Sequence, residues 1–277
     1  MPVFLSNMKL SIITVNLNNS PGLRKTIESV VCQTYTDYEF IIIDGGSSDG
    51  SVDLIKEYNG GIGHWISEPD NGIYNAMNKG IKMAKGDYCI FLNSGDFLYS
   101  METIEQVFQG SDGIDILYGD VLLSLSSGET RVKKHPSLLS FFYFYIGTIC
   151  HQAAFIKRQL FDEYGLYNES YKIVSDWDFF IRTIVFSDVK TRHIDQIISV
   201  HNTEGFGNQN PKLYITERQQ ILDGVLPTLV LADYDQYKNN YSDIQSLFNI
   251  KKYKLSYFVF KVFKRITSVI TGWSQSE

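Results

Sequence analysis

Asp44 lies where an apolar stretch changes abruptly into a loop of small polar residues, in IIIDGGSSDGS (41–51). A carboxylate at the end of such a strand commonly accepts hydrogen bonds from a nucleotide, often from its ribose hydroxyls. The glycines let a ligand approach the backbone closely, and the serines and Asp49 can cap the helix that follows. A plain strand-to-helix loop is the alternative interpretation, so the meaning of Asp44 depends on the elements around it.

The β-branched, apolar stretch KLSIITVN and the stretch YEFIIID predict two buried strands, and IGHWIS and DYCIFLN predict a third and a fourth strand. Helical spacing of apolar residues predicts helices between them, within 21–33, 51–58 and 71–84. Strands and helices that alternate at short intervals predict an α/β fold, an open and mostly parallel sheet with helices on both faces. Such sheets bind ligands beyond the carboxyl ends of their strands. Those ends carry polar or acidic groups, in Thr14–Asn16, Asp44–Ser48, Ser67–Asp70 and Asn93–Asp96.

The alternation weakens after about Ile114, which predicts a mixed second part. DILYGDVLLSLSSGETRVKKH predicts two strands around a turn, CHQAAFIKR a further strand, and the stretch from Asp176 to Phe186 a helix. After Gly207 the sequence becomes helical and polar. We therefore expect a catalytic-type α/β domain over residues 1–205 and a helical carboxyl-terminal extension over 206–277.

The composition is that of a globular protein, with 277 residues, 44% hydrophobic and 20% charged. A net charge of −6 argues against a general nucleic-acid binder. Cys32, Cys89 and Cys150 are far apart in the sequence, which predicts reduced core thiols. Residues 1–10 lack the pattern of a signal peptide, and the uncharged stretch 135–156 contains too many interruptions for a membrane span. We expect a cytoplasmic protein.

A dinucleotide-binding enzyme would carry GxGxxG after the first strand, where this chain has NLNNSPG, so that class is excluded. The blocks SIITVNLNNSPGLRKTIESVVCQTYTDYEFIIIDGGSSDGS and SEPDNGIYNAMNKGIKMAKGDYCIFLNSGD instead resemble family 2 glycosyltransferases of the GT-A fold. CHQAAFIKR and SDWDFFIR resemble the later acceptor-side and catalytic segments of that family. The resemblance covers roughly residues 8 to 205, with several spaced blocks in the right order.

The resemblance implies a nucleoside diphosphate sugar as donor, with uridine diphosphate favoured. It places Thr14, Asn16 and Asp44 in the nucleoside site, with Asp44 at the base or ribose. It also turns the helix with Asn78 and Lys79 toward the nucleotide. Lys79 would approach a phosphate, although a solvated lysine is the simpler interpretation.

The same resemblance places FLNSGDF where the family carries its Asp-x-Asp metal motif. It implies Mn²⁺ or Mg²⁺ on the leaving diphosphate, because hard cations prefer carboxylate and phosphate oxygens. Asn93 replaces the first acid, so Asp96 is the remaining carboxylate ligand and Asn93 a nucleotide contact. His201 would reach the metal or the diphosphate. An ordinary turn is the alternative interpretation of NSGD.

SDWDFF resembles the segment that supplies the catalytic base, with Ser175 in place of a glutamate and Asp176 matching the aspartate. The implied mechanism is a single inverting displacement in which Asp176 takes the proton of the acceptor hydroxyl. A helix cap is the plainer role for such a carboxylate. The remaining candidates lie on the acceptor side. They are Asp178, which ranks second as the base, and His151, Gln152 and Asp120.

The leading hypothesis is therefore a glycosyltransferase that builds a surface polysaccharide or glycolipid on a saccharide or lipid-linked acceptor. A sugar-phosphate nucleotidyltransferase is the second hypothesis, although its Gly-rich basic loop after the first strand is missing. A non-catalytic nucleotide-sugar-binding module is the third. The presence of Asp44, Asp96 and Asp176 together argues against it.

The segment IKKYKLSYFVFKVFKRITSVITGW (250–273) contains six basic residues and no acidic residue. Its apolar residues recur at helical spacing, which predicts a helix lying on an anionic membrane surface. A lipid-linked acceptor would give such attachment at the inner face of the cytoplasmic membrane a purpose. A helix that packs on the catalytic domain, or on a second subunit in a homo-oligomer, is the alternative.

Overall fold

The computed structural model describes residues 10–108, 113–252 and 254–271. The chain divides into two compact units, of which the first ends at Ile221 and the second begins at Leu222. The first unit thus extends past residue 205, where the sequence predicted the domain to end. Its last part belongs to helix α9 (Pro211–Val225), whose Glu217 and Arg218 are buried among the loops of the first unit.

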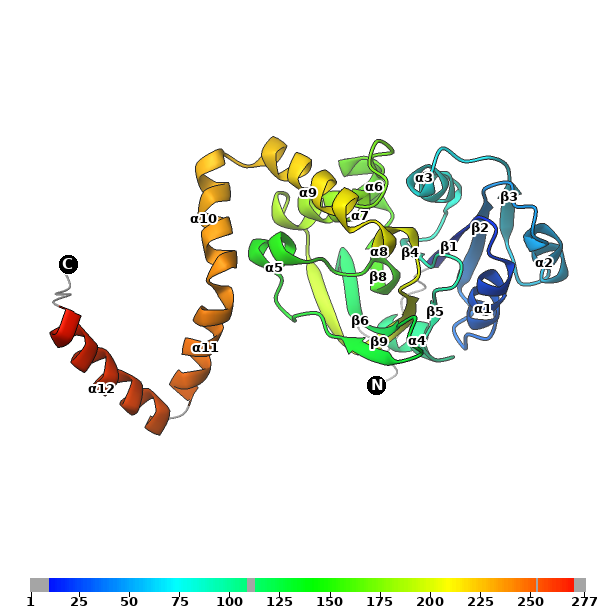
Figure 1. The fold of residues 1–277 in the computed structure, drawn as a ribbon. Helices are drawn as coiled ribbons and strands as arrows, with labels where there is room; N and C mark the ends of the chain where they lie inside the picture. The colour runs from blue at the N-terminus through cyan, green and yellow to red at the C-terminus, as the bar shows by residue number, and fades with distance from the viewer. Residues whose placement is uncertain (1–9, 109–112, 253, 272–277) are drawn as a thin grey trace. The chain divides into compact units, whose positions relative to one another are not determined.

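Four parallel strands form the first half of the sheet, as predicted (Figure 1). They are adjacent in the order β3 (His64–Ser67), β2 (Tyr38–Asp44), β1 (Leu10–Asn16) and β4 (Tyr88–Phe91). The pairing register aligns Asn16 with Asp44 and Asp44 with Ser67. The predicted polar groups at the carboxyl ends of these strands therefore meet at one edge.

Helices cover both faces of this half of the sheet (Figure 1). Successive strand residues point to opposite sides, so each face presents side chains on which a helix can pack. Ile12 belongs to a buried cluster with residues of α1 (Ser20–Val31) and α2 (Ser51–Glu57). Its neighbour Ile13 faces α3 (Ile73–Met83) so closely that a Cβ at Gly80 would lie 2.4 Å from Ile13 Cγ2. The small residue at position 80 thus sets how near α3 lies to the sheet.

The second half of the sheet is mixed, which confirms the prediction for this part of the chain. Beyond β4 the order continues through β8, β6, β9 and β5, with β7 paired to β6. Among the described strands of this half, β6 and β9 are the one pair that is parallel. The bounds are β5 (Phe97–Leu98), β6 (Ile116–Ser124), β7 (Thr130–Lys133), β8 (Ala154–Lys157) and β9 (Thr191–Asn202).

Short helices surround this half and carry much of the candidate site. Within CHQAAFIKR, predicted as a strand, residues His151–Ala153 form a 3₁₀ turn and the strand begins only at Ala154. The predicted helix from Asp176 begins one residue earlier, as α7 (Ser175–Phe180), and continues as a π-helical turn over Ile181–Val185. The others are α4 (Thr103–Phe108), α5 (Phe141–Ile146) and α6 (Gln159–Tyr164).

The carboxyl-terminal region is helical, as predicted. It contains α8 (Phe206–Gln209), α9, α10 (Thr228–Asn239), α11 (Tyr241–Lys252) and α12 (Lys254–Thr271). No helix within the described ranges is long and apolar enough to cross a membrane. Of the predicted tail, Tyr253 and residues 272–273 lie outside the described residues, as do residues 1–9 of the amino-terminal segment.

The three cysteines are free thiols, but they are not all in the core. Cys89 is buried in β4, and Cys150 is partly buried before the 3₁₀ turn. Cys32 is exposed directly after α1, which corrects the prediction that all three are core residues.

Candidate active site

Asp44 is fully buried at the end of β2 and accepts four hydrogen bonds. The donors are Asn16 Nδ2 at 2.7 Å, Ser67 Oγ at 2.6 Å, and the backbone N and Oγ of Ser47 at 2.9 and 2.6 Å. Burial alone would raise the pKa of Asp44, but these hydrogen bonds bring it below its usual value. The carboxylate is therefore ionised and held by its own neighbours.

Two other residues of the predicted nucleoside site keep unused polar atoms. Thr14 Oγ1 and Asn16 Oδ1 are buried and have no hydrogen-bond partner in the described part of the chain. Buried polar atoms are normally paired, so unpaired ones at a strand end indicate a place where a ligand is expected to bind. The structure thus brings Thr14, Asn16 and Asp44 together at the predicted edge.

The helix α3 turns Asn78 and Lys79 toward protein groups. Asn78 is buried and hydrogen-bonded to the backbone N and O of Tyr167 and to Glu169 Oε1. Lys79 Nζ forms ion pairs with Glu68 at 2.7 Å and Asp70 at 2.6 Å. Before Lys79 could contact a phosphate, a nucleotide would have to compete with these two carboxylates.

Asp96 is buried after β4 and is joined to the end of β9, which lies more than a hundred residues further along the chain. Its Oδ1 accepts from Asn202 N at 2.9 Å and lies 3.0 Å from His201 Nδ1. Both contacts end on Oδ1, so among the described residues Oδ2 has no hydrogen-bond donor and is available for a ligand. Asn93, three residues earlier, has a buried Oδ1 without a partner among the described residues.

Asp176 lies in the first turn of α7 and is contacted by two side chains from distant segments and by the next backbone N–H. His151 Nδ1 lies 2.8 Å from its Oδ2, while Tyr74 Oη and Trp177 N lie 3.0 and 2.9 Å from its Oδ1. The Tyr74 hydroxyl carries one hydrogen, which Asp176 Oδ1 and Ile173 O, at 2.6 Å, share. A carboxylate has about four lone-pair positions, so a further hydroxyl can still be accommodated.

His151 and Asp176 stabilise each other's charged form. Burial would raise the pKa of Asp176, but the hydrogen bond and the charge of His151 bring it below its usual value. Burial would likewise lower the pKa of His151, and its hydrogen bond with Asp176 raises it instead. The pair is thus predisposed to an imidazolium beside a carboxylate.

The consecutive residues His151 and Gln152 connect the two carboxylates. His151 contacts Asp176 through Nδ1, and its Nε2 lies 3.3 Å from Asn93 Nδ2. Gln152 contacts His201 Nδ1, which is also the nitrogen nearest to Asp96. One 3₁₀ turn therefore joins the predicted base to the predicted metal ligands.

Two acidic candidates have other partners. Asp178 forms an ion pair with Arg182 at 3.0 Å on the same helix. Asp120 is buried in β6 and accepts from His135 N at 2.9 Å and lies 3.0 Å from His193 Nε2. Neither has a hydrogen bond with Asp176, His151 or Asp96 among the described residues.

Tyr74, Ser47 and Ser67 are contacts of the key carboxylates that were not predicted as site residues. Ser47 and Ser67 were visible only as members of polar strand ends. Tyr74 is buried in the first turn of α3, and its hydroxyl reaches Asp176 across 102 positions of sequence. No local pattern indicates such a contact.

The residues around Asp96 fit a hard divalent cation in part. The described residues contain no cluster of three or more His, Cys, Asp or Glu side chains able to enclose an ion. Mg²⁺-type sites, however, commonly use one or two carboxylates and complete their shell with substrate phosphates and water. Asp96, with His201 beside it, matches that incomplete donor set.

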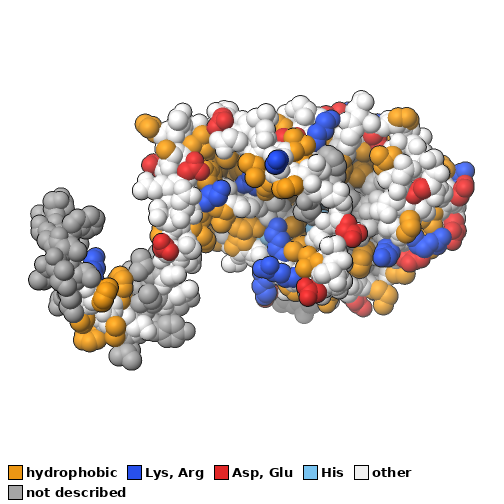
Figure 2. Space-filling view, in the orientation of Figure 1, with side chains coloured by type: hydrophobic (Ala, Val, Ile, Leu, Met, Phe, Trp, Pro, Cys, Tyr) orange, Lys and Arg blue, Asp and Glu red, His pale blue; other side chains and the backbone are white. Residues whose placement is uncertain are grey.

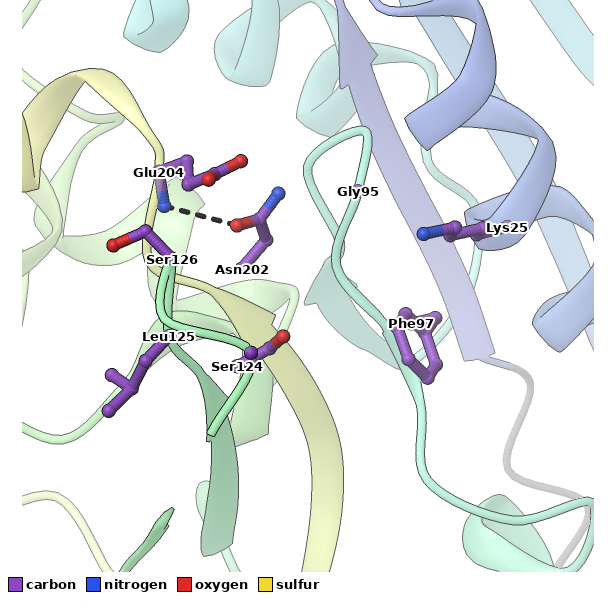
Figure 3. A pocket seen from close by; sticks show the side chains of 9 residues that line it. Lys25, Gly95, Phe97, Ser124, Leu125, Ser126, Asn202 and Glu204 are labelled. Carbon is purple, nitrogen blue, oxygen red and sulfur yellow. Dashed lines mark hydrogen bonds between the residues drawn. The ribbon is translucent and has the colours of Figure 1, made fainter. Parts of the chain in front are cut away.

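A pocket of about 220 Å³ lies next to Asp96, between the turn after β4 and the β6–β7 turn (Figure 3). Lys25 and Phe97 point into it from one side, and Ser124, Ser126, Asn202 and Glu204 lie on the other. The amide oxygen of Asn202 accepts from Glu204 N at 3.1 Å, which fixes the strand end at the pocket wall. The lining is mainly polar, with Phe97 and Leu125 as its apolar side chains.

Known proteins resemble this chain in sequence and in fold. A glycosyltransferase of PGL/p-HBAD biosynthesis from Mycobacterium bovis is 33% identical over 201 residues, covering 70% of this chain and 77% of the relative. An uncharacterized glycosyltransferase of Rickettsia typhi is 27% identical over 90% of this chain and 82% of its own.

Among solved structures, residues 1–349 of S. aureus TarS in complex with UDP-GlcNAc match with a TM-score of 0.62 and 18% identity, over 83% of this chain and 70% of that one. The chain spans 42% of the longer TarS structure. The mannosyltransferase PcManGT of Pyrobaculum calidifontis, with GDP-Man and Mn²⁺, matches with a TM-score of 0.56 and 14% identity, over 73% and 59% of the two chains. These likenesses show a GT-A-type fold. The model of glycosyl transferase family 2 matches residues 11–165, and the chain belongs to that family.

Proposed function

We propose that this protein transfers a hexose from a nucleoside diphosphate sugar, with UDP favoured, to a hydroxyl of a saccharide or lipid-linked acceptor, with inversion. The observation that carries the proposal is the His151–Gln152 turn, which holds Asp176 and the Asp96–His201 pair in one site. The TarS and PcManGT structures contain UDP-GlcNAc and GDP-Man, which supports a nucleotide-sugar donor.

Asp176 is the proposed base. Its lowered pKa keeps it ionised, and the lone-pair position left by His151, Tyr74 and Trp177 can accept the proton of an acceptor hydroxyl. That hydroxyl then attacks the anomeric carbon from the face opposite the diphosphate, which inverts the configuration. His151 orients the carboxylate and stabilises its charge until the proton arrives.

The donor occupies the other end of the site. Asp96 and His201 would hold Mg²⁺ or Mn²⁺, which stabilises charge on the leaving diphosphate. Thr14 Oγ1 and Asn16 Oδ1 offer unpaired acceptors to the nucleoside, and Asp44 orients Asn16 and Ser47 beneath it. Asn93 supplies a further amide oxygen near the diphosphate, and Lys79 would contact a phosphate in exchange for its ion pairs with Glu68 and Asp70.

The named relative acts in PGL/p-HBAD biosynthesis, which supports a role in surface polysaccharide or glycolipid synthesis. The two alternatives, a sugar-phosphate nucleotidyltransferase and a non-catalytic binding module, have less support. Membership of a family whose named relatives are glycosyltransferases argues against the first. The ionised Asp176–His151 pair, which a binding module has no need to maintain, argues against the second.

Thermal unfolding with UDP, GDP and TDP, each with Mn²⁺ or with EDTA, tests the donor. A ligand that binds the native state raises the melting temperature, so we expect the largest rise for UDP with Mn²⁺. Release of UDP from UDP-glucose, UDP-galactose and UDP-GlcNAc then identifies the sugar. If no nucleoside diphosphate stabilises the protein and none of these donors is cleaved, the proposal is wrong.

The proposal extends to a membrane role for the second unit. Phe258, Val259, Val262 and Phe263 are exposed on α12, and Lys261 lies among them (Figure 2). An apolar helix surface beside basic residues suits a helix lying on an anionic bilayer, at the cytoplasmic face where a lipid-linked acceptor would be reached.

Sedimentation with vesicles of phosphatidylserine and phosphatidylcholine tests this membrane role. The double variant Lys261→Glu and Lys264→Glu should lose binding, whereas Lys238→Glu on α10 should keep it. If the wild type does not bind these vesicles, or if the double variant binds as well as the wild type, attachment through α12 is wrong. Concentration-dependent self-association of the wild type, removed by the double variant, would assign α12 to a homo-oligomer instead.

A further inference from the structure

The strongest unassigned feature is the pair of buried charged residues Glu217 and Arg218 on α9, a helix outside the family-model match at residues 11–165. Charged residues are rarely buried unless they have partners that compensate for the lost hydration. Glu217 accepts hydrogen bonds from the backbone shortly before Asp176, and Arg218 packs on the ring of Trp177, the residue after it.

Glu217 holds the segment directly before α7. Its Oε1 accepts from Lys172 N at 2.7 Å and its Oε2 from Ile173 N at 3.0 Å. The carbonyl of Ile173 in turn accepts from the Tyr74 hydroxyl, which also lies 3.0 Å from Asp176 Oδ1. One carboxylate therefore fixes the backbone three residues before the base and the hydroxyl that contacts it.

Arg218 holds the residue after the base. Its guanidinium lies 4.2 Å from the centre of the Trp177 ring, and it donates to the carbonyls of Phe144, Tyr145 and Gly147. Trp177 Nε1 donates to Phe144 O at 2.9 Å, and Trp177 N donates to Asp176. The arginine thus ties α7 to the end of α5 through the neighbour of the base.

We propose that Glu217 and Arg218 are positioning residues for Asp176, so that α9 forms part of the catalytic apparatus. The inference rests on the proposed role of Asp176 as base. Misplacement of a catalytic group by about 1 Å can lower a rate by about 100-fold, so small movements of the segment 172–177 should be visible in kcat.

Arg218 also acts on Asp176 through its charge. Five described groups have a pKa on which the charge of Asp176 acts: Tyr74, Cys150, His151, Tyr167 and Arg218. Of these five described residues, Arg218 alone carries a positive charge at every working pH. Burial lowers the pKa of Arg218, and the charge of Asp176 partly offsets this. The same attraction favours the ionised form of Asp176.

Arg182 offers a matched control, because it is also an arginine over an aromatic ring of α7. Its guanidinium lies 5.5 Å from the centre of the Phe179 ring, it pairs with Asp178, and it donates to the carbonyls of Tyr164 and Leu166. It has no contact with Asp176 in the described structure. The variants Arg218→Gln and Arg182→Gln therefore remove similar interactions at different distances from the base.

The test measures kcat and KM for UDP release, with the UDP-sugar that the wild type cleaves, as a function of pH. Arg218→Gln should lower kcat about 10- to 100-fold with little change in donor KM, and should shift the acid limb of kcat to higher pH. Arg218→Lys, which restores the charge, should return that limb toward the wild-type pH. Arg182→Gln should leave the limb in place.

The inference is overturned if Arg218→Gln keeps the wild-type kcat and pH profile, or if Arg182→Gln shifts the acid limb equally. Should Arg218→Gln fail to fold, Glu217→Gln and Arg218→Lys decide the matter. Glu217→Gln should lower kcat more than donor affinity, and an unchanged kcat in both variants refutes the inference. A wild-type rate in Asp176→Asn would instead refute the base assignment itself.

Discussion

Asp44 and Asp176 are both buried carboxylates whose pKa lies below its usual value, but their partners come from different ranges of the sequence. Asp44 takes its donors from Asn16, Ser47 and Ser67, all at the ends of neighbouring parallel strands or in the loop that follows. Asp176 takes two of its donors from Tyr74 and His151, which belong to distant segments.

The difference separates a site that the sheet builds by itself from one that long-range packing assembles. Parallel strands bring their carboxyl ends to one edge whatever the rest of the chain does. The surroundings of Asp176 require α3, the 3₁₀ turn, α7 and α9 to meet. Changes near Asp44 should therefore act mainly on folding and nucleotide binding, and changes near Asp176 mainly on turnover.

The largest expected effect is the loss of turnover in Asp176→Asn. Removal of a general base lowers a rate by about 10²–10⁴-fold, while UDP affinity should stay nearly unchanged. Steady-state kinetics and isothermal titration with UDP measure the two quantities. Asp178→Asn is the control, because Asp178 pairs with Arg182; a greater loss in this control would move the base to Asp178.

Asp44→Asn, in contrast, should act mainly on the stability of the fold. The amide cannot accept all four hydrogen bonds, so buried donors lose their partners at a cost of about 1–3 kcal/mol in unfolding free energy. Nucleotide affinity should fall as well, because Asn16 and Ser47 lose their fixed orientation. Ser67→Ala removes a single donor and should have a smaller effect in urea denaturation. Equal stabilities of Asp44→Asn and the wild type would contradict the structural role.

The third prediction concerns Asp96. Like Asp44 it follows a strand of the sheet, and like Asp176 it has partners from a distant segment. Asp96→Ala should weaken UDP binding by about tenfold or more with Mn²⁺, since loss of groups around a metal lowers affinity to that degree. In EDTA the two proteins should bind UDP almost equally. Equal losses in both conditions would make Asp96 structural, and full wild-type turnover in EDTA would exclude a metal-assisted reaction.

The smallest expected effect is a change in the pH dependence of stability. Because the pKa of His151 is raised in the folded state, its protonation adds to the free energy of unfolding. This stabilisation is complete below about pH 6.5 and is lost as pH rises through the folded-state pKa. The lowered pKa of Asp176 also stabilises the folded state, and this stabilisation is lost only as pH falls through the folded-state pKa of Asp176.

The unfolding free energy of His151→Gln should therefore differ from that of the wild type more at pH 5.5 than at pH 9. His64→Gln in β3 serves as an exposed control. Should the difference grow toward pH 9, the two groups do not form the ion pair described.

The same comparison explains what sequence alone could predict. The runs before Asn16, Asp44 and Asn93 are apolar and β-branched, so the strands and the polar edge follow from local pattern. The meeting of Asp96 with His201 depends on how β9 pairs within the sheet, and only family resemblance indicated it. Tyr74, Glu217 and Arg218 stayed unpredicted because their roles depend on contacts with distant backbone, which leave no local pattern.

The peptide unit between His151 and Gln152 has a consequence for how this enzyme can diversify. His151 contacts Asp176, and the next residue, Gln152, contacts His201. Because no loop lies between these two contacts, the distance between the proposed base and the proposed metal ligands cannot be adjusted by lengthening one. A larger donor or acceptor must be accommodated elsewhere. The β6–β7 turn at residues 125–129, which contributes to the wall of the pocket beside Asp96, is free of that restriction. We expect relatives that use other sugars to differ in the length of this turn, while the spacing of the two contact residues stays constant.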